Sequence, residues 1–137
     1  EGLTTNGFCR PIRVQSRPRR RVSMSDDCIF CKIRDGEVPG EVLYRDDYCL
    51  VIRDIAPQAP AHLLVIPLQH FTYLTELTQD FYPTLGAMFS AARETAETQG
   101  ISAGGYRLVI NQGENAGQVV PHLHLHLLGG KPLERMG

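Results

Sequence analysis

The sequence predicts an α+β fold, in which an antiparallel sheet of about five strands carries one long helix on one face. Three observations support this. Residues 121–129, Pro-His-Leu-His-Leu-His-Leu-Leu-Gly, alternate polar and apolar from His122 to Leu127, which is the period of a half-buried strand. The run 62–67 is rich in apolar and β-branched residues and predicts a central strand. Residues 80–99 hold the one long helical pattern, with strand patterns before and after it.

The other elements follow in chain order. Residues 28–33 predict a short helical turn, and residues 42–45 and 49–54 predict a hairpin turned at Asp46-Asp47. The Pro-containing stretch 56–60 excludes a helix interior or a central strand. Residues 106–111 predict the strand that follows the helix. The chain shows no internal repeat.

The helical pattern carries its own boundary signals. Pro83 belongs in a first turn, Asp80 is the expected cap, and Gly100 is the expected glycine after the last turn. The apolar stripe that we expect to face the core consists of Leu85, Met88, Phe89, Ala92 and Ala96.

Charge divides the chain into two parts. Residues 1–23 hold six Arg against one Glu, a net charge of +5, which leaves −6 for the rest of a chain whose net charge is −1. We therefore expect a disordered basic segment over 1–23 and one folded domain over 24–137. An acidic domain argues against polymeric nucleic acid as its main ligand, while a small nucleotide remains compatible. No apolar run approaches the ~18 residues of a membrane span.

The basic segment has three interpretations: sequence translated upstream of a natural start at Met24, which we favour; the remnant of an organelle transit peptide; or a functional basic arm. Four cysteines, at 9, 28, 31 and 49, are too few for a secreted disulfide scaffold. We therefore expect reduced thiols and a cytoplasmic protein, or an organellar one if residues 1–23 are a transit remnant.

Three of the five histidines stand at every second position of the 121–129 stretch. Same-face neighbours on a strand lie roughly 6.5–7 Å apart, so His122, His124 and His126 would line one small patch. Imidazole titrates near neutral pH, acts as a nucleophile and binds metals. Three interpretations follow: a His-rich strand facing solvent, a metal site, or a catalytic site, which we favour.

Two further stretches carry polar groups suited to a ligand. Asp54 ends a predicted strand, where its carboxylate would at least cap the following turn. Asn111 precedes a turn-rich loop, residues 112–118, whose backbone N–H groups could hold an anion. Beside the histidines, this loop is a candidate phosphate cradle.

The pattern His122-x-His124-x-His126 with apolar x resembles the histidine triad (HIT) superfamily of nucleotide hydrolases and transferases. The uridylyltransferase branch carries Gln at the third position, and Leu127-Leu-Gly-Gly130 is more similar to the histidine triad nucleotide-binding (Hint) branch than to the dinucleoside polyphosphate hydrolases. The resemblance runs from Cys28 to Gly130. It includes Asp54-Ile-Ala-Pro-Gln-Ala-Pro-Ala-His62, Val65-Ile-Pro67 and Asn111-Gln-Gly.

The resemblance implies hydrolysis of a purine nucleoside 5′-phosphoramidate, such as adenosine 5′-monophosphoramidate, through a covalent nucleotidyl-histidine and without a catalytic metal. It implies that His124 is the nucleophile, that His126 contacts an oxyanion or the leaving group, and that His62 and His122 complete the set. It implies a homodimer. The nucleotide would be held by Ile29, Phe30, Ile33 and Ile52 at the base, Asp54 at the ribose, and Asn111 with the backbone of Gly117, Gln118 and Val119 at the phosphate.

Two alternatives to this function remain: a dinucleoside polyphosphate hydrolase, or a nucleotide- or zinc-binding interaction protein with little turnover. Two departures from the Hint pattern matter: the first reduces one phosphate contact to a backbone contact, and the second leaves the leaving-group preference open. Val119 stands where Hint proteins commonly carry Ser, and residues 131–137 lack the Trp of the family's C-terminal tail.

A structural zinc is the remaining prediction. The spacing of Cys28 and Cys31 suits two thiolates on one Zn²⁺, and such a site needs two more ligands. The resemblance implies His62 and His122 as those ligands, while His70 is expected to have only a surface or packing role. The alternative is a pair of reduced, buried cysteines beside the base pocket.

Overall fold

The computed structural model describes residues 27–136. The predicted basic segment 1–23, Met24 and Cys9 lie outside the described residues. Within residues 27–136, no helix is long and apolar enough to cross a membrane.

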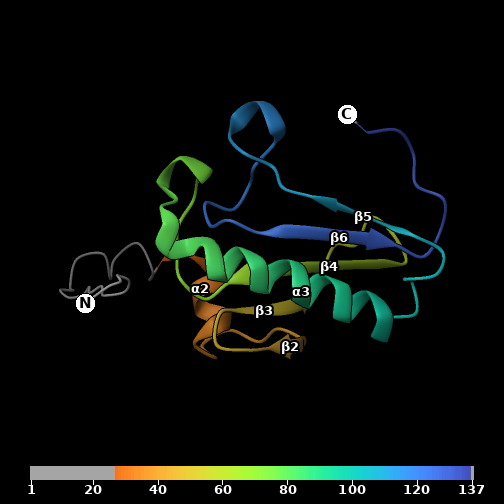
Figure 1. The fold of residues 1–137 in the computed structure, drawn as a ribbon, viewed down its shortest axis with the longest axis horizontal. Coiled ribbons are helices and arrows are strands. Elements are labelled where there is room, and N and C mark those ends of the chain that lie inside the picture. The colour runs from red at the N-terminus through yellow and green to blue at the C-terminus, as the bar shows by residue number, and fades with distance from the viewer. Residues whose placement is uncertain (1–26, 137) are drawn as a thin grey trace.

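One antiparallel sheet organises the described part of the chain (Figure 1). Its five strands lie in the order β2-β3-β4-β6-β5, so the central strand β4 pairs with β3 and β6. Every residue of β4 is buried. The predicted fold class is confirmed. The bounds are β2 Val42–Arg45, β3 Cys49–Arg53, β4 Ala61–Pro67, β5 Tyr106–Val109 and β6 Leu125–Gly129.

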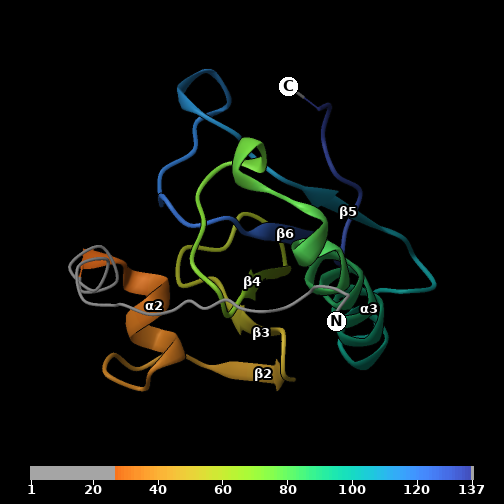
Figure 2. The ribbon, with the colours of Figure 1, turned by 60° about the vertical axis from the view of Figure 1, so that its left-hand side comes forward.

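Two helices cover opposite faces of this sheet (Figure 2): the long α3 (Tyr82–Thr98) and the short α2 (Ile29–Arg34). Because side chains alternate along a strand, each central strand contributes to both cores. Val51, Leu63 and Leu125 belong to the core under α3, whereas Leu50, Ile52 and Leu64 belong to the core under α2. Each buried Leu contributes about 1.5–3 kcal/mol, so the two cores account for much of the fold's stability.

The long helix differs from its prediction in three details. It begins at Tyr82, because residues 79–81 form a separate 3₁₀ turn, η3 (Gln79–Phe81), and Asp80 makes no capping bond. Pro83 does lie in the first turn, and Gly100 has the left-handed φ of +75° after the last turn, as predicted. Phe89 is 51% exposed, so its predicted core position is wrong. The buried face consists of Thr84, Met88, Ala91, Ala92, Thr95 and Ala96, because small side chains let the helix approach the sheet closely.

The histidine-rich strand also begins later than predicted. β6 starts at Leu125, and its register with β4 would place Leu123 opposite Pro67. Pro67 has no N–H to donate, so the ladder ends there, and the N–H of Leu123 donates to the carbonyl of Phe71 instead, at 2.7 Å. The predicted alternation persists, since Leu123, Leu125 and Leu127 all lie in the core under α3.

Candidate active site

A cavity of about 460 Å³ opens on the α2 side of the sheet. It lies between α2, the ends of β3 and β4, and the loop that leads into β6. Of the residues predicted to bind nucleotide or act on it, it is lined by Ile29, Phe30, Ile33, Ile52, Asp54, His62, Asn111, Gly117, Val119, His124 and His126. The structure therefore brings together side chains from five separate segments, and only Gln118 and His122 of the predicted set do not line the cavity.

Sequence reasoning missed several lining residues, namely Arg53, Ile55, Ala56, Gln58, Leu64 and Val120. A signal existed for Leu64, because it lies two residues after His62 on the same strand and so shares its face. Gln58 carried no such signal, since its role is played by its backbone.

His124 is held in one tautomer. Its Nδ1 lies 2.8 Å from the carbonyl oxygen of His122, and a carbonyl only accepts, so Nδ1 carries the proton. The other nitrogen, Nε2, is therefore unprotonated in the neutral ring. Burial lowers the pKa of His124, which keeps the ring neutral near pH 7. A buried, neutral imidazole with a lone pair on Nε2 is suited to nucleophilic attack.

His62 and His126 form a hydrogen-bonded chain with a defined direction. The backbone N–H of Gln58 donates to His62 Nδ1 at 3.0 Å, so the proton of neutral His62 is on Nε2. That Nε2–H lies 3.0 Å from His126 Nδ1 and donates to it. The proton of His126 is consequently on Nε2. Burial, with neighbouring His124 and His62, lowers the pKa of His126 to about 4, so this Nε2–H is a neutral donor near pH 7.

Asp54 stands beside this chain. Its Oδ1 accepts the N–H of Ala56 at 2.8 Å, which is the predicted turn cap. Its Oδ2 lies 3.4 Å from Nε2 of His62. We call Asp54, His62, His124 and His126 the aspartate–histidine cluster. Burial lowers the pKa of His62, while the Asp54 carboxylate opposes that shift.

Most backbone N–H groups of the loop predicted to bind phosphate donate to acceptors within that loop. Gly117 N–H donates to Glu114 O and Gln118 N–H donates to Gly113 O, both at 3.0 Å, around the 3₁₀ turn η4 (Glu114–Ala116). The Gln118 side chain also turns inward: its Oε1 accepts from Gly113 N–H at 2.8 Å, and its Nε2 donates to Thr72 O. The backbone N–H groups of Gly117 and Gln118, predicted to face the phosphate, are therefore both bonded within the loop, and Gln118 does not line the cavity.

Val119 and Asn111 remain as donors at this end of the cavity. Among the described residues, nothing accepts a hydrogen bond from the Val119 N–H or from the Asn111 side-chain amide. The Val119 side chain is 88% exposed at the rim of the cavity, so the backbone of this residue can face a ligand.

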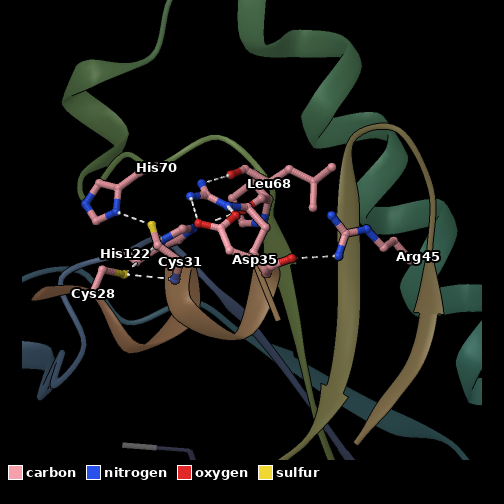
Figure 3. Close-up of polar contacts among 9 residues, drawn as sticks. Cys28, Cys31, Asp35, Arg45, Leu68, His70 and His122 are labelled. Atoms are coloured by element: carbon pink, nitrogen blue, oxygen red, sulfur yellow. Dashed lines mark hydrogen bonds and ion pairs between the residues drawn. The ribbon is translucent and has the colours of Figure 1, made fainter. Parts of the chain in front are cut away.

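A second group of polar side chains lies close together without lining the cavity (Figure 3). It consists of Cys28, Cys31, His70 and His122, whose ligand atoms all lie within 4.8 Å of one another; we call it the cysteine–histidine cluster. His122 Nδ1 is 3.3 Å from Cys28 Sγ and 3.6 Å from Cys31 Sγ, and His70 Nδ1 is 3.2 Å from Cys31 Sγ.

The predicted metal set is corrected at one position by this arrangement. His62 was expected as the fourth ligand, but it lies in the aspartate–histidine cluster, bonded to His126. His70 takes its place, because the chain turns back after β4 ends at Pro67 and returns the half-buried His70 to Cys31. A lone His in a loop offered no sequence signal for this.

The donor chemistry of the cysteine–histidine cluster fits zinc. Tetrahedral Zn²⁺ at about 2.0–2.3 Å from its ligands places neighbouring ligand atoms roughly 3.5 Å apart, close to the distances found. His122 Nε2–H donates to Pro67 O at 3.0 Å, so Nδ1 presents a lone pair toward the sulfurs. A backbone carbonyl on the second nitrogen is the usual support of a metal-bound imidazole.

Asp54, His62 and His126 also have ligand atoms within 4.8 Å of one another, but they do not fit a metal. His62 accepts at Nδ1 and carries its proton on Nε2, so it has no lone pair to offer there.

This chain is similar in sequence and in structure to known histidine triad proteins. The HIT domain model matches residues 35–133. The purine nucleoside phosphoramidase of Escherichia coli is 42% identical over 113 residues, which cover 82% of this chain and 95% of that protein. A HIT family hydrolase from Legionella pneumophila is similar in structure, with a TM-score of 0.76, 44% identity, and coverage of 79% of this chain and 96% of its own. A zinc-bound histidine triad family protein from Mycobacterium smegmatis has a TM-score of 0.67 and 32% identity, covering 78% of this chain and 77% of its own.

Proposed function

The chain belongs to the HIT family, and from that premise we propose that it is a hydrolase of purine nucleoside 5′-phosphoramidates, acting through a covalent nucleotidyl-histidine. One observation carries the proposal: His124 is locked by the His122 carbonyl so that its unprotonated Nε2 is available at the cavity. The name of the E. coli relative, purine nucleoside phosphoramidase, supports the substrate class.

The residues that line the cavity suit different parts of such a substrate. The apolar side chains of Phe30, Ile33 and Ile52 suit a purine base. Asp54 suits the ribose hydroxyls, because an ionised carboxylate only accepts hydrogen bonds. The Asn111 amide and the Val119 N–H suit the phosphate oxygens.

The reaction runs in two displacements. His124 Nε2 attacks the α-phosphorus, the P–N bond breaks, and the amine leaves with a proton taken from solvent. Water then attacks the same phosphorus and gives one proton back to solvent, the bond to His124 breaks, and a nucleoside monophosphate is released. Covalent catalysis replaces one difficult displacement by two easier ones.

The polar partners of His124 act at each displacement. The His122 carbonyl stabilises the positive ring of the nucleotidyl-imidazole through the Nδ1–H bond. The Nε2–H of His126 donates to an oxyanion or the leaving group. The Nε2–H of His62 donates to His126 Nδ1, and this bond keeps the proton of His126 on its Nε2.

We also propose one structural zinc per chain, held by Cys28, Cys31, His70 and His122. A closed Cys₂His₂ site supplies cross-linking between segments and offers no open position to substrate. None of the steps above passes through it. The homodimer and the cytoplasmic location stay predictions.

A turnover panel tests the proposed reaction. Purified full-length protein is incubated with adenosine and guanosine 5′-phosphoramidates, their pyrimidine counterparts and diadenosine polyphosphates, with His124→Ala protein as the blank. We expect release of purine nucleoside monophosphate from the phosphoramidates, faster than from any other substrate. Preferential cleavage of diadenosine polyphosphates would identify the alternative hydrolase instead, and nucleotide binding without turnover would identify a binding protein.

A further inference from the structure

His122 belongs to the cysteine–histidine cluster and is hydrogen-bonded to His124 of the aspartate–histidine cluster. Its ring lies in the cysteine–histidine cluster, with Nδ1 facing Cys28 and Cys31 (Figure 3). Its Nε2–H donates to Pro67 O. Its carbonyl accepts the Nδ1–H of His124 at 2.8 Å. The ring is fully buried, with 0% exposure. Contacts that fix the His122 ring therefore also fix the His122 peptide group, whose carbonyl selects the tautomer of His124.

The backbone around His122 lies beyond the end of the β4–β6 ladder. β6 begins only at Leu125, so residues 122–124 lie outside the ladder with β4. Two other backbone bonds hold this stretch: His122 N–H to Val120 O at 2.8 Å, and Leu123 N–H to Phe71 O at 2.7 Å. Three side-chain contacts add to these bonds: Thr72 Oγ1 donates to Pro121 O at 2.8 Å, the Leu123 side chain is buried in the core under α3, and the His122 ring is held in the cysteine–histidine cluster. Of the three, only the last acts on His122 directly.

A second connection runs through Phe30, which stands between the two cysteines in the chain. Its ring packs edge-on against both His122, at a centroid distance of 5.8 Å, and His124, at 5.0 Å. The thiol of Cys28 also accepts the N–H of Cys31 at the start of α2. Movement of the thiols would therefore move the ring that backs the nucleophile.

We propose that the cysteine–histidine cluster, with its metal bound, positions the nucleophile and does more than stabilise the fold. Cys28, Cys31 and His70 act as positioning residues: they hold the His122 ring, and the His122 carbonyl then holds His124 with its proton on Nδ1. The prediction for turnover rests on the proposed phosphoramidase activity, whereas the prediction for the His124 tautomer does not.

The test compares zinc-loaded full-length protein with the same protein stripped by a chelator and then reloaded. Protein labelled with ¹⁵N-histidine reports the tautomer of each ring, and His124→Ala identifies the His124 signals. We expect a single Nδ1–H form of His124 when zinc is bound, a mixture of tautomers when it is removed, and recovery on reloading. We expect kcat to fall about 10- to 100-fold without zinc, with the KM and the affinity for AMP within about threefold.

Two variants make the test decisive. His70→Ala removes one ligand while leaving both thiols and the His122–Pro67 bond, so it serves if the stripped protein unfolds; we expect tautomer mixing and a lower kcat. Cys49→Ala is the matched control, because Cys49 is a buried cysteine in the other core, under α3, and should change neither readout.

The proposal is overturned if a folded zinc-free protein or His70→Ala keeps the pure Nδ1–H form of His124. If the tautomer responds to zinc but no phosphoramidate is hydrolysed by the loaded wild type, the positioning role stands and the proposed activity fails.

Discussion

The cysteine–histidine cluster and the Asp54–His62–His126 group contain similar potential ligand atoms, yet their hydrogen bonds suit them to different roles. Both gather potential ligand atoms within 4.8 Å, and burial lowers the pKa of His122 in one and of His126 in the other to about 4. They differ in the backbone partner of one histidine. A carbonyl, that of Pro67, accepts from His122 Nε2, whereas an N–H, that of Gln58, donates to His62 Nδ1.

That single difference decides where the lone pairs point. The Pro67 carbonyl leaves His122 with a lone pair toward two sulfurs, which is what a metal requires. Because the Gln58 N–H donates to His62 Nδ1, the proton of His62 is on Nε2 and points toward His126. This bond determines which nitrogen of His126 carries its proton. A cluster of histidines therefore cannot be assigned to metal binding or catalysis from its composition, and the four predictions below test the assignment made here.

The largest expected effect is the loss of the nucleophile. His124→Ala should lower turnover by well over the ~10²–10³-fold that removal of an oxyanion donor costs, because no other group can form the covalent intermediate. The variant should keep its zinc content and much of its nucleotide affinity, measured by elemental analysis and calorimetry. More than a tenth of wild-type activity would show that another residue attacks phosphorus.

The next effect separates the two clusters by metal content. His70→Gln should lose zinc, whereas His62→Gln should retain about one zinc per chain. Zinc present at a thousand times its Kd stabilises by about 4 kcal/mol, so its loss should lower the Tm by on the order of 15 °C. Loss of zinc in His62→Gln, with retention in His70→Gln, would restore the ligand set that the sequence suggested.

A smaller effect concerns Asp54. A 2′,3′-dideoxy nucleoside monophosphate should bind about 5- to 100-fold more weakly than the parent, because it leaves the half-buried carboxylate without its partner, a loss of about 1–3 kcal/mol. Calorimetry with both ligands measures the difference. Asp54→Asn should shrink the discrimination, and equal affinities for wild-type protein would remove Asp54 from the ribose site.

The smallest effect is on acid stability. His126 has a pKa of about 4 when folded, below the 6.5 of an ordinary His, so between these values the unfolded state binds a proton that the folded state excludes. The free energy of unfolding should therefore fall as the pH drops from about 6.5 to about 4. Denaturant unfolding of wild type and His126→Gln at pH 7 and pH 4.5 should show a smaller loss in the variant; equal losses would contradict the low pKa.

The fold was predictable because its signals are local. The alternation around His124, the apolar run that became β4, and the helix closed by Gly100 each follow from period and backbone chemistry. The predictions that were wrong concerned residues whose local pattern allows more than one position, and tertiary contacts decided between those positions. Phe89 fits the apolar stripe by spacing, yet small residues occupy the face against the sheet, and Pro67 stops the ladder before His122 reaches it.

By itself, the sequence determined which side chains share the histidine face, because strand alternation depends on spacing along the chain. The family pattern predicted most of the cavity lining and missed the rest, Arg53 and Gln58 among them. Only the tertiary structure decided which nitrogen of each histidine carries the proton. The partners that select its tautomer are the carbonyls of Pro67 and His122 and the N–H of Gln58, and backbone groups of this kind leave no trace in a pattern of side chains. His70 joined the thiols for the same reason, since a turn after β4, and not a sequence spacing, returns it to Cys31.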